Sequence, residues 1–311
     1  YSNDMWPRHP EAKAGTYPNL PLIEGDEIRD PEITPEKQCQ LTTWYTERAV
    51  SFIARHKDQP FFLYVPHTMV HVPLAVSDKF KDKSGAGLFG DVVMELDWSV
   101  GQILDTVKRN GLDDNTLVVF TSDNGGAFGE VSKEYEFKPG RLGGTDYVFF
   151  GSTGPFRAFK GSIYEGGLRV PFIARWPGRI KPGMVNETPL AFYDVLPTFC
   201  ALAGMNPPRA ADGLSFLSAL TGKGKQRQHE FLFWDFGGYG GQQAVRLGQW
   251  KGLRRNLHLG STKLELYDLK NDVGEQHDVA AQHPDLVKRI EKILAEQHRP
   301  SVLFPFKVLG E

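Results

Sequence analysis

The sequence predicts an α/β fold, with a mostly parallel sheet flanked by helices and a small C-terminal antiparallel sheet plus helix. Two continuous apolar runs, at 61–65 and 117–120, suit strands buried on both faces, and a helical pattern separates them. After about Gly222 the pattern changes to short runs joined by Gly-rich turns. We therefore predict an α/β domain over residues 1–225 and a C-terminal subdomain over 226–311.

The first 40 residues are rich in Pro, Asp, Glu and Asn, so we expect an irregular surface segment there. Apolar residues at helical spacing predict helices over 42–56 and 90–109, the second ended by Asn110-Gly111. Further along, the chain shows another buried-strand run at 170–174 and a helix over 193–203.

The C-terminal subdomain is expected to begin with short antiparallel strands. Their centres are predicted at 231–234, 244–246, 250–251 and 264–267. A last helix is predicted over 284–298, because Pro284 stands in its first turn and apolar residues keep one face.

Composition excludes several classes of protein. The 311 residues contain 36 Lys plus Arg and 38 Asp plus Glu, and this net charge of −2 lacks the basic excess of a nucleic-acid binder. The longest apolar runs fall far short of the ~20 residues that cross a bilayer, so no membrane partner is expected. Cys39 and Cys200 make neither a disulfide framework nor a zinc pattern.

Polar residues follow the second apolar run directly, where open α/β sheets bind ligands. Asp123 and Asn124 offer hard oxygen ligands suited to Ca²⁺ or Mg²⁺, and Gly125 and Gly126 allow a tight backbone turn. The alternative is a plain turn, because these residue types dominate turns.

Two histidines and a lysine are further candidates. His67 and His71 follow the first apolar run, and each is either catalytic or a structural histidine. Lys160 stands among apolar and glycine neighbours, where it either holds an anion as a point charge or lies along the surface with a solvated head.

Taken together, the motifs resemble those of the type I sulfatases, most closely the arylsulfatase A and N-acetylgalactosamine-6-sulfatase type. The resemblance covers the C-terminal two-thirds of such an enzyme and nearly all of this chain. The matching segments are 60–73, 89–97, 121–125, 154–160, 164–171, 194–198 and 266–275. It implies the alkaline-phosphatase-like fold, with the N-terminal part missing.

The resemblance also implies roles for single residues. Asp123 and Asn124 match two calcium ligands, and Lys160 matches the lysine that contacts the sulfate and the ester oxygen. His71 matches the histidine that protonates the leaving alcohol. His67 is a weaker candidate for the same role and is expected to bind the substrate. Ser2 matches a serine near the sulfate.

The chain also departs from the family pattern. Type I sulfatases convert the first residue of a Cys- or Ser-x-Pro-x-Arg motif to formylglycine, and neither Cys39 nor Cys200 stands in such a motif. The early Asp-Asp pair that completes the calcium site is absent too. We therefore expect an incomplete Ca²⁺ site, a fragment that is inactive alone, and the missing N-terminal segment as a possible separate partner chain.

These residues favour a sulfuric ester hydrolase that acts on a sulfated carbohydrate or an aryl sulfate. Two alternatives stay open: a phosphodiesterase or phosphonate hydrolase of the same superfamily, and a catalytically dead sugar-binding relative. By family resemblance alone the protein is expected to be exported, to a periplasm or outside the cell, or lysosomal.

The C-terminal subdomain is expected to determine substrate choice. Four glycines surround Tyr239 in the loop after the first predicted strand, which favours a role in which its ring faces a sugar. The alternative is that this ring packs the small sheet onto the main domain. Trp234 favours the packing role. Arg246 is a candidate for binding further sulfate or carboxylate groups.

Overall fold

The structure is a computed structural model, and it describes residues 18–71, 73–126 and 153–311. The chain forms two compact units, with the division after Thr116. Each unit is described by itself below. The subdomain boundary that the sequence predicts between residues 225 and 226 lies inside the second unit and stays a prediction.

The first unit begins with a hairpin and a short helix. Strand β1 (Leu22–Glu24) pairs antiparallel with β2 (Glu27–Asp30), and Gly25 turns the chain with a φ of 62°. Helix α1 (Pro35–Gln38) follows, capped by the side chain of Thr34. The expectation of an irregular segment over residues 1–40 is therefore wrong for this stretch, because hydrogen bonds across a tight turn need no hydrophobic periodicity.

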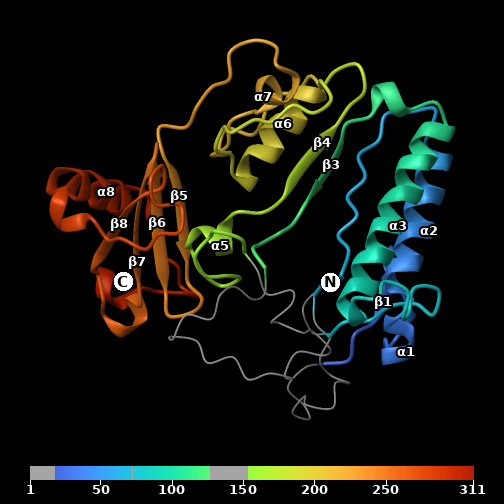
Figure 1. Cartoon of the computed structure of the whole chain (residues 1–311), viewed down its shortest axis with the longest axis horizontal. Coiled ribbons are helices and arrows are strands. Elements are labelled where there is room, and N and C mark those ends of the chain that lie inside the picture. The colour runs from blue at the N-terminus through green and yellow to red at the C-terminus, as the bar shows by residue number, and fades with distance from the viewer. Residues whose placement is uncertain (1–17, 72, 127–152) are drawn as a thin grey trace. The chain divides into compact units, whose positions relative to one another are not determined.

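Two long helices, α2 (Leu41–Arg55) and α3 (Gly87–Arg109), form the frame of the first unit, and they lie side by side (Figure 1). Both confirm the helical spacing in the sequence. A polar contact joins them in the interior, where the Thr46 hydroxyl donates to Ser99 Oγ at 2.6 Å. The turn η1 (Asp113–Asn115) follows α3.

The segment after α2 contradicts the sequence prediction of a strand over 61–65. No described strand includes these residues, and the side chains of Phe62 and Tyr64 are 69% and 74% exposed. An apolar run forms a buried strand only when neighbouring strands supply hydrogen bonds, and a single sequence does not show whether they are present.

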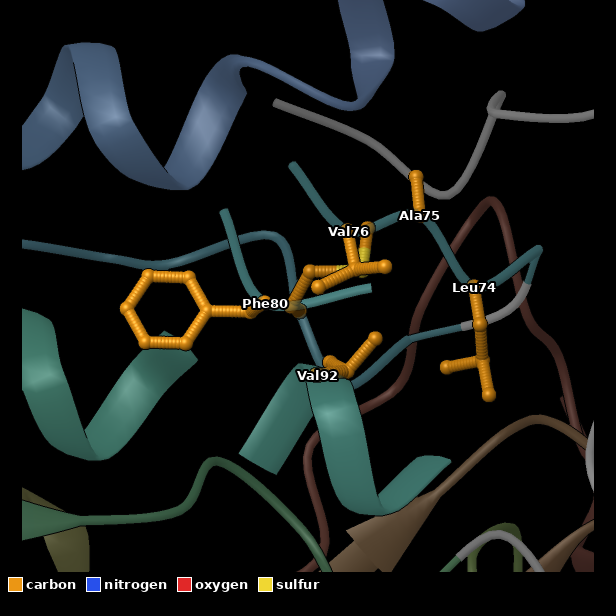
Figure 2. Packing of buried hydrophobic residues seen from close by; sticks show 6 residues of the cluster. Leu74, Ala75, Val76, Phe80 and Val92 are labelled. Carbon is orange, nitrogen blue, oxygen red and sulfur yellow. The ribbon is translucent and has the colours of Figure 1, made fainter. Parts of the chain in front are cut away.

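The chain then returns to the interior and builds the core of the first unit. Figure 2 shows this core, which contains Leu74, Val76 and Phe80 from the loop before α3 together with Val92 from α3 itself. Trp98 packs on Phe80 with ring centroids 5.5 Å apart. The loop thus buries Val92 on one face of α3, whereas its neighbour Val93 is 41% exposed.

The second unit starts with an isolated pair of strands. Strand β3 (Val118–Thr121) pairs antiparallel with β4 (Phe172–Arg175), as both apolar runs predicted for their positions. They are not buried on both faces, since Ile173 is 62% exposed. Each of the three sheets within the described part of the chain is antiparallel, so the mostly parallel sheet that the sequence predicts is not found among these residues.

Short helices lie between β3 and the C-terminal sheet, one of them before β4 and the others after it. They are α5 (Glu165–Leu168), η2 (Phe192–Asp194), α6 (Val195–Leu202) and α7 (Leu217–Thr221). Asp194 is fully buried between them, where it accepts hydrogen bonds from the backbone amides of Ala191 and Leu214 and pairs with His229 Nε2 at 2.7 Å. This carboxylate therefore fixes the connecting loops.

The C-terminal sheet contains four antiparallel strands in sequential order, with helix α8 (Pro284–Gln297) against it (Figure 1). The strands are β5 (Leu232–Phe236), β6 (Gln242–Leu247), β7 (Trp250–Arg255) and β8 (Leu264–Asp268). Val245, Leu266 and Ile290 make the core between sheet and helix. Strands and helix confirm the sequence prediction for this part.

Three further turns complete the unit: η3 (Leu257–Leu259), η4 (Ala280–Gln282) and η5 (Lys307–Leu309). The helices among the described residues are all too short or too polar to span a bilayer.

Candidate functional site

Glycines bring three segments of the second unit into backbone contact. The Gly125 amide donates to the Gly167 carbonyl at 3.0 Å, and the Lys160 amide donates to the Gly126 carbonyl at 2.8 Å. A Cβ on Gly125 would lie 1.9 Å from the carbonyl oxygen of Gly166, so no larger residue fits without movement of the backbone. The loop after β3 is thereby fixed against the segment that carries Lys160.

The structure thus brings together three of the residues singled out in the sequence, namely Asp123, Asn124 and Lys160. Asp123 is exposed, and Asn124 and Lys160 are half-buried. Across the described ranges, neither the Asp123 carboxylate nor the Lys160 ammonium forms an ion pair. Within these residues, neither charge is therefore neutralised by an opposite charge.

The donor chemistry at this loop fits a hard cation, but the number of donors is small. Asp123 and Asn124 offer a carboxylate and an amide oxygen, whereas Ca²⁺ takes six to eight oxygen ligands. The part of the chain that the structure describes contains no group of three or more His, Cys, Asp or Glu residues that could hold a metal ion.

His67 lies in the first unit, between α2 and α3. Its Nε2 lies 3.3 Å from Ser99 Oγ, and its ring centroid is 6.4 Å from that of Tyr45. Burial lowers the pKa of this imidazole below its usual value of 6.5, because charging a desolvated ring is unfavourable. His67 is therefore a neutral interior histidine, and its surroundings support a structural role.

His71 also belongs to the first unit, in the loop after the apolar run. It is half-buried, and its backbone amide donates to the Thr68 carbonyl at 3.1 Å in a turn. That turn is the local reason why the chain bends at this histidine. Its neighbour in the motif, residue 72, lies outside the described residues, as does Ser2.

Tyr239 lies in the loop between β5 and β6, in the second unit together with Lys160. Its ring covers Gly161 so closely that a Cβ there would lie 2.8 Å from the tyrosine Cζ. The ring remains 67% exposed. A largely exposed aromatic residue therefore contacts Gly161, the sequence neighbour of Lys160.

Arg246 lies on β6 and contacts groups of the chain itself. Its guanidinium donates from Nε to the Gly248 carbonyl at 3.2 Å, and Nη1 lies 3.9 Å from Glu165 Oε2. Burial lowers its pKa below the usual value, and the charge of Glu165 opposes that shift. The structure thus gives Arg246 partners within the chain.

Sequence reasoning did not find the buried charge cluster beneath the site. Lys251 Nζ lies 2.8 Å from Glu165 Oε1 and 3.0 Å from Glu275 Oε1, and the lysine side chain is 0% exposed. Glu275 also accepts a hydrogen bond from the Glu165 amide at 2.6 Å. This cluster joins α5 to the C-terminal sheet. Glu165 and Glu275 both stand in motifs noted above, but no local pattern marks Lys251 as buried.

The chain matches two family models. Residues 6–205 match the model described as "Sulfatase", and residues 154–299 match the one described as "N-sulphoglucosamine sulphohydrolase, C-terminal". The first match covers well over half of the 311 residues. The chain belongs to the sulfatase family.

Curated sulfatases share about a third of their residues with this chain. An N-acetylgalactosamine-6-O-sulfatase of Bacteroides thetaiotaomicron is 35% identical over 262 residues, which are 80% of this chain and 49% of the relative. The N-acetylgalactosamine-6-sulfatase of Mus musculus is 35% identical over 265 residues, 80% of this chain and 47% of the relative. The chain thus spans about half the length of these relatives.

Solved sulfatase structures confirm the fold class. A Bacteroides thetaiotaomicron chain, solved in work on its metabolism of multiple glycosaminoglycans, has a TM-score of 0.68 at 32% identity, over 86% of this chain and 56% of that one. A chain in complex with a neocarrahexaose has a TM-score of 0.70 at 27% identity, over 89% and 57%. A phosphonate monoester hydrolase of Agrobacterium radiobacter is 18% identical and has a TM-score of 0.59, over 85% of this chain and 61% of that one. At this identity the likeness shows a shared fold alone.

The two sulfatase models together cover the residues of the site. Asp123, Asn124 and Lys160 fall in the first matched range, and Tyr239 falls in the second. Gly161 and Tyr239 both fall in the second matched range, so their contact lies within the residues that match it.

Proposed function

We propose that this chain carries the sulfate-binding and sugar-binding part of a carbohydrate sulfatase. The observation that supports the proposal most strongly is the contact of Tyr239 with Gly161, next to Lys160. A sulfated sugar presents an apolar ring face and an anionic group, and here an exposed tyrosine contacts Gly161, the sequence neighbour of the positively charged Lys160. The names of the relatives, which act on N-acetylgalactosamine 6-sulfate, agree with this substrate class.

Each residue of the proposed site has a defined task. Lys160 binds the sulfate oxygens through its ammonium group and stabilises the charge that grows on them. Asp123 and Asn124 would hold a Ca²⁺ ion, which neutralises the sulfate when it is bound. His71 donates a proton from its imidazole to the oxygen of the leaving alcohol. By the resemblance Ser2 would contact the sulfate, and Arg246 would bind a further sulfate or carboxylate group of the substrate.

The nucleophile is not among these residues. Neither Cys39 nor Cys200 stands in a formylglycine motif, so we propose that a segment outside these 311 residues supplies it, together with further calcium ligands. The chain by itself should then bind substrate without turning it over. By analogy with the sulfatase family, we propose that the protein is exported or lysosomal.

Calorimetric titration of the 311-residue chain tests the binding part of the proposal. We expect N-acetylgalactosamine 6-sulfate to bind more tightly than unsulfated N-acetylgalactosamine. Lys160→Met should weaken binding of the sulfated sugar about tenfold or more, because a charge-assisted hydrogen bond is lost. Lys223→Met is the matched control, since Lys223 is an exposed lysine of the same unit. Equal binding of both sugars would contradict the proposal.

The role of His71 is tested by two leaving groups in the protein with its nucleophile segment present. A general acid matters most when the departing oxygen is strongly basic. His71→Ala should therefore reduce turnover of a carbohydrate sulfate far more than turnover of nitrophenyl sulfate. Equal losses would assign His71 to sulfate binding, and hydrolysis of phosphonate monoesters in preference to sulfates would favour the alternative reaction.

A further inference from the structure

The position of Tyr239 depends on a loop of glycines, residues 237–241, which we call the glycine loop. Gly240 and Gly241 have φ values of 87° and 77°, and Tyr239 itself has a φ of 46°. Such an angle is rare for a residue with a Cβ, so the backbone of Tyr239 needs support from its surroundings, whereas the glycines adopt their angles without strain. Support for one side comes from η3, where the His258 amide donates to the Gly240 carbonyl at 2.9 Å.

The other support is the C-terminal segment, residues 301–311. A Cβ on Gly237 would lie 2.6 Å from Phe304 Cβ, and a Cβ on Gly241 would lie 2.7 Å from Phe306 Cε1. Phe306 is 2% exposed. Two phenylalanines thus pack on the first and last residues of the glycine loop, and only glycines leave room for them.

A histidine between two carboxylates attaches this segment to the sheet. His298 Nδ1 lies 2.5 Å from Asp235 Oδ2, at the end of β5 just before the glycine loop. His298 Nε2 pairs with Glu311, whose second oxygen accepts the Phe306 amide at 2.9 Å. One imidazole therefore connects the strand before the loop to the residue that covers its end.

A cavity of about 660 Å³ adjoins this arrangement. Its lining includes Asp235, Gly237, His298, Phe304 and Phe306. A loop beside open volume is not held on that side by close packing. The ion pairs of His298 and the two phenylalanines therefore hold the glycine loop on this side, and η3 holds it on the other.

We propose that the C-terminal segment is a specificity-determining element of the sugar site, with His298, Phe304 and Phe306 as positioning residues. By holding the glycine loop, they keep the ring of Tyr239 on Gly161 next to Lys160. The inference rests on the proposed function for the role of Tyr239 in sugar binding. It predicts that the segment affects binding of the sugar ring and leaves binding of the sulfate group unchanged.

The test compares two ligands on the 311-residue chain, N-acetylgalactosamine 6-sulfate and inorganic sulfate, by calorimetry. His298→Ala should weaken binding of the sulfated sugar about tenfold, because it removes both charged hydrogen bonds. Binding of inorganic sulfate should stay within about twofold, because Lys160 is untouched. Glu311→Gln keeps the shape of its side chain and should give a smaller loss in the same direction.

Hydrogen exchange supplies an independent readout of loop position. In His298→Ala and Phe306→Ala, exchange should rise about tenfold in peptides covering 237–241, with β7 unchanged. Leu303→Ala is the matched control, because Leu303 lies in the same segment with an exposed side chain, and it should change nothing.

The outcomes separate the two proposals. If the wild-type chain fails to bind the sulfated sugar while exchange rises as expected, the proposed function fails and the positioning of the loop stands. If the sugar binds and His298→Ala alters neither its affinity nor loop exchange, the positioning role is refuted. Equal losses for sulfated sugar and inorganic sulfate would refute it as well, because a general loss of structure would then explain both.

Discussion

The cluster of Lys251, Glu165 and Glu275 gives a quantitative prediction about stability. Lys251→Met keeps an apolar side chain of similar length and removes the ammonium group, which leaves two buried carboxylates without their cation. The lysine makes two charged contacts, at 2.8 and 3.0 Å, from a fully buried position. Breaking a buried pair by removing one partner costs about 3–5 kcal/mol, so we expect a loss of at least about 3 kcal/mol at neutral pH.

Protonation of Glu275 should relieve part of this loss. Burial raises the pKa of this carboxyl above its usual 4.5, although the charge of Lys251 opposes the shift. Because the pKa in the folded state is raised, stabilisation by this group is present at low pH and is lost as the pH rises through the folded-state pKa. In Lys251→Met the pKa of Glu275 should rise further, because the opposing charge of the lysine is gone. The difference from wild type should therefore shrink between pH 7 and pH 5.

Hydrogen exchange of β6 and β7 under native conditions measures the second unit separately. A loss of about 3 kcal/mol raises exchange there by more than about a hundredfold, since about 1.4 kcal/mol corresponds to a factor of ten. Lys292→Met is the matched control, because Lys292 is exposed and only pairs with Glu296 on α8, so it should cost less than about 0.5 kcal/mol. A loss below about 1 kcal/mol for Lys251→Met, or a difference that grows at pH 5, would refute the reasoning.

Three further predictions concern other parts of the chain. Gly125→Ala should clearly lower the melting temperature, because its Cβ would collide with the Gly166 carbonyl. Gly101→Ala, in open space on α3, should instead raise the stability of the chain by about 0.5–1 kcal/mol. Similar shifts of the melting temperature in both variants would contradict this prediction. Burial lowers the pKa of His298, but hydrogen bonds to two carboxylates outweigh it and raise the pKa. The stability that protonated His298 contributes to the fold should therefore be present below pH 6.5 and be lost as the pH rises through the raised pKa. If His298→Asn has the same dependence of melting temperature on pH as the wild type, this prediction is wrong. Ca²⁺ should bind the 311-residue chain more weakly than about 1 mM by calorimetry, and micromolar binding abolished in Asp123→Ala would show that the loop after β3 suffices.

The sequence alone determined the elements whose patterns are local. Helical spacing placed α2, α3 and α8 within a few residues, because an amphipathic face is written in the order of residues along one helix. Gly-rich turns between short apolar runs likewise indicated the C-terminal strands. The ordered motifs by themselves also indicated the sulfatase family, since they consist of residue types in a fixed order.

Only the tertiary structure decided which residues have partners. Lys251 and Lys160 are both lysines beside glycines and apolar residues in the sequence, yet the fold buries one between two carboxylates and leaves the other accessible. The apolar run at 61–65 predicted a strand, and the fold supplies none there. The ring of Tyr239 reaches Gly161 across 78 positions of the chain. Periodicity reports the neighbours along one element, whereas burial and pairing depend on residues distant in the sequence, and these contacts exist only once the chain has folded.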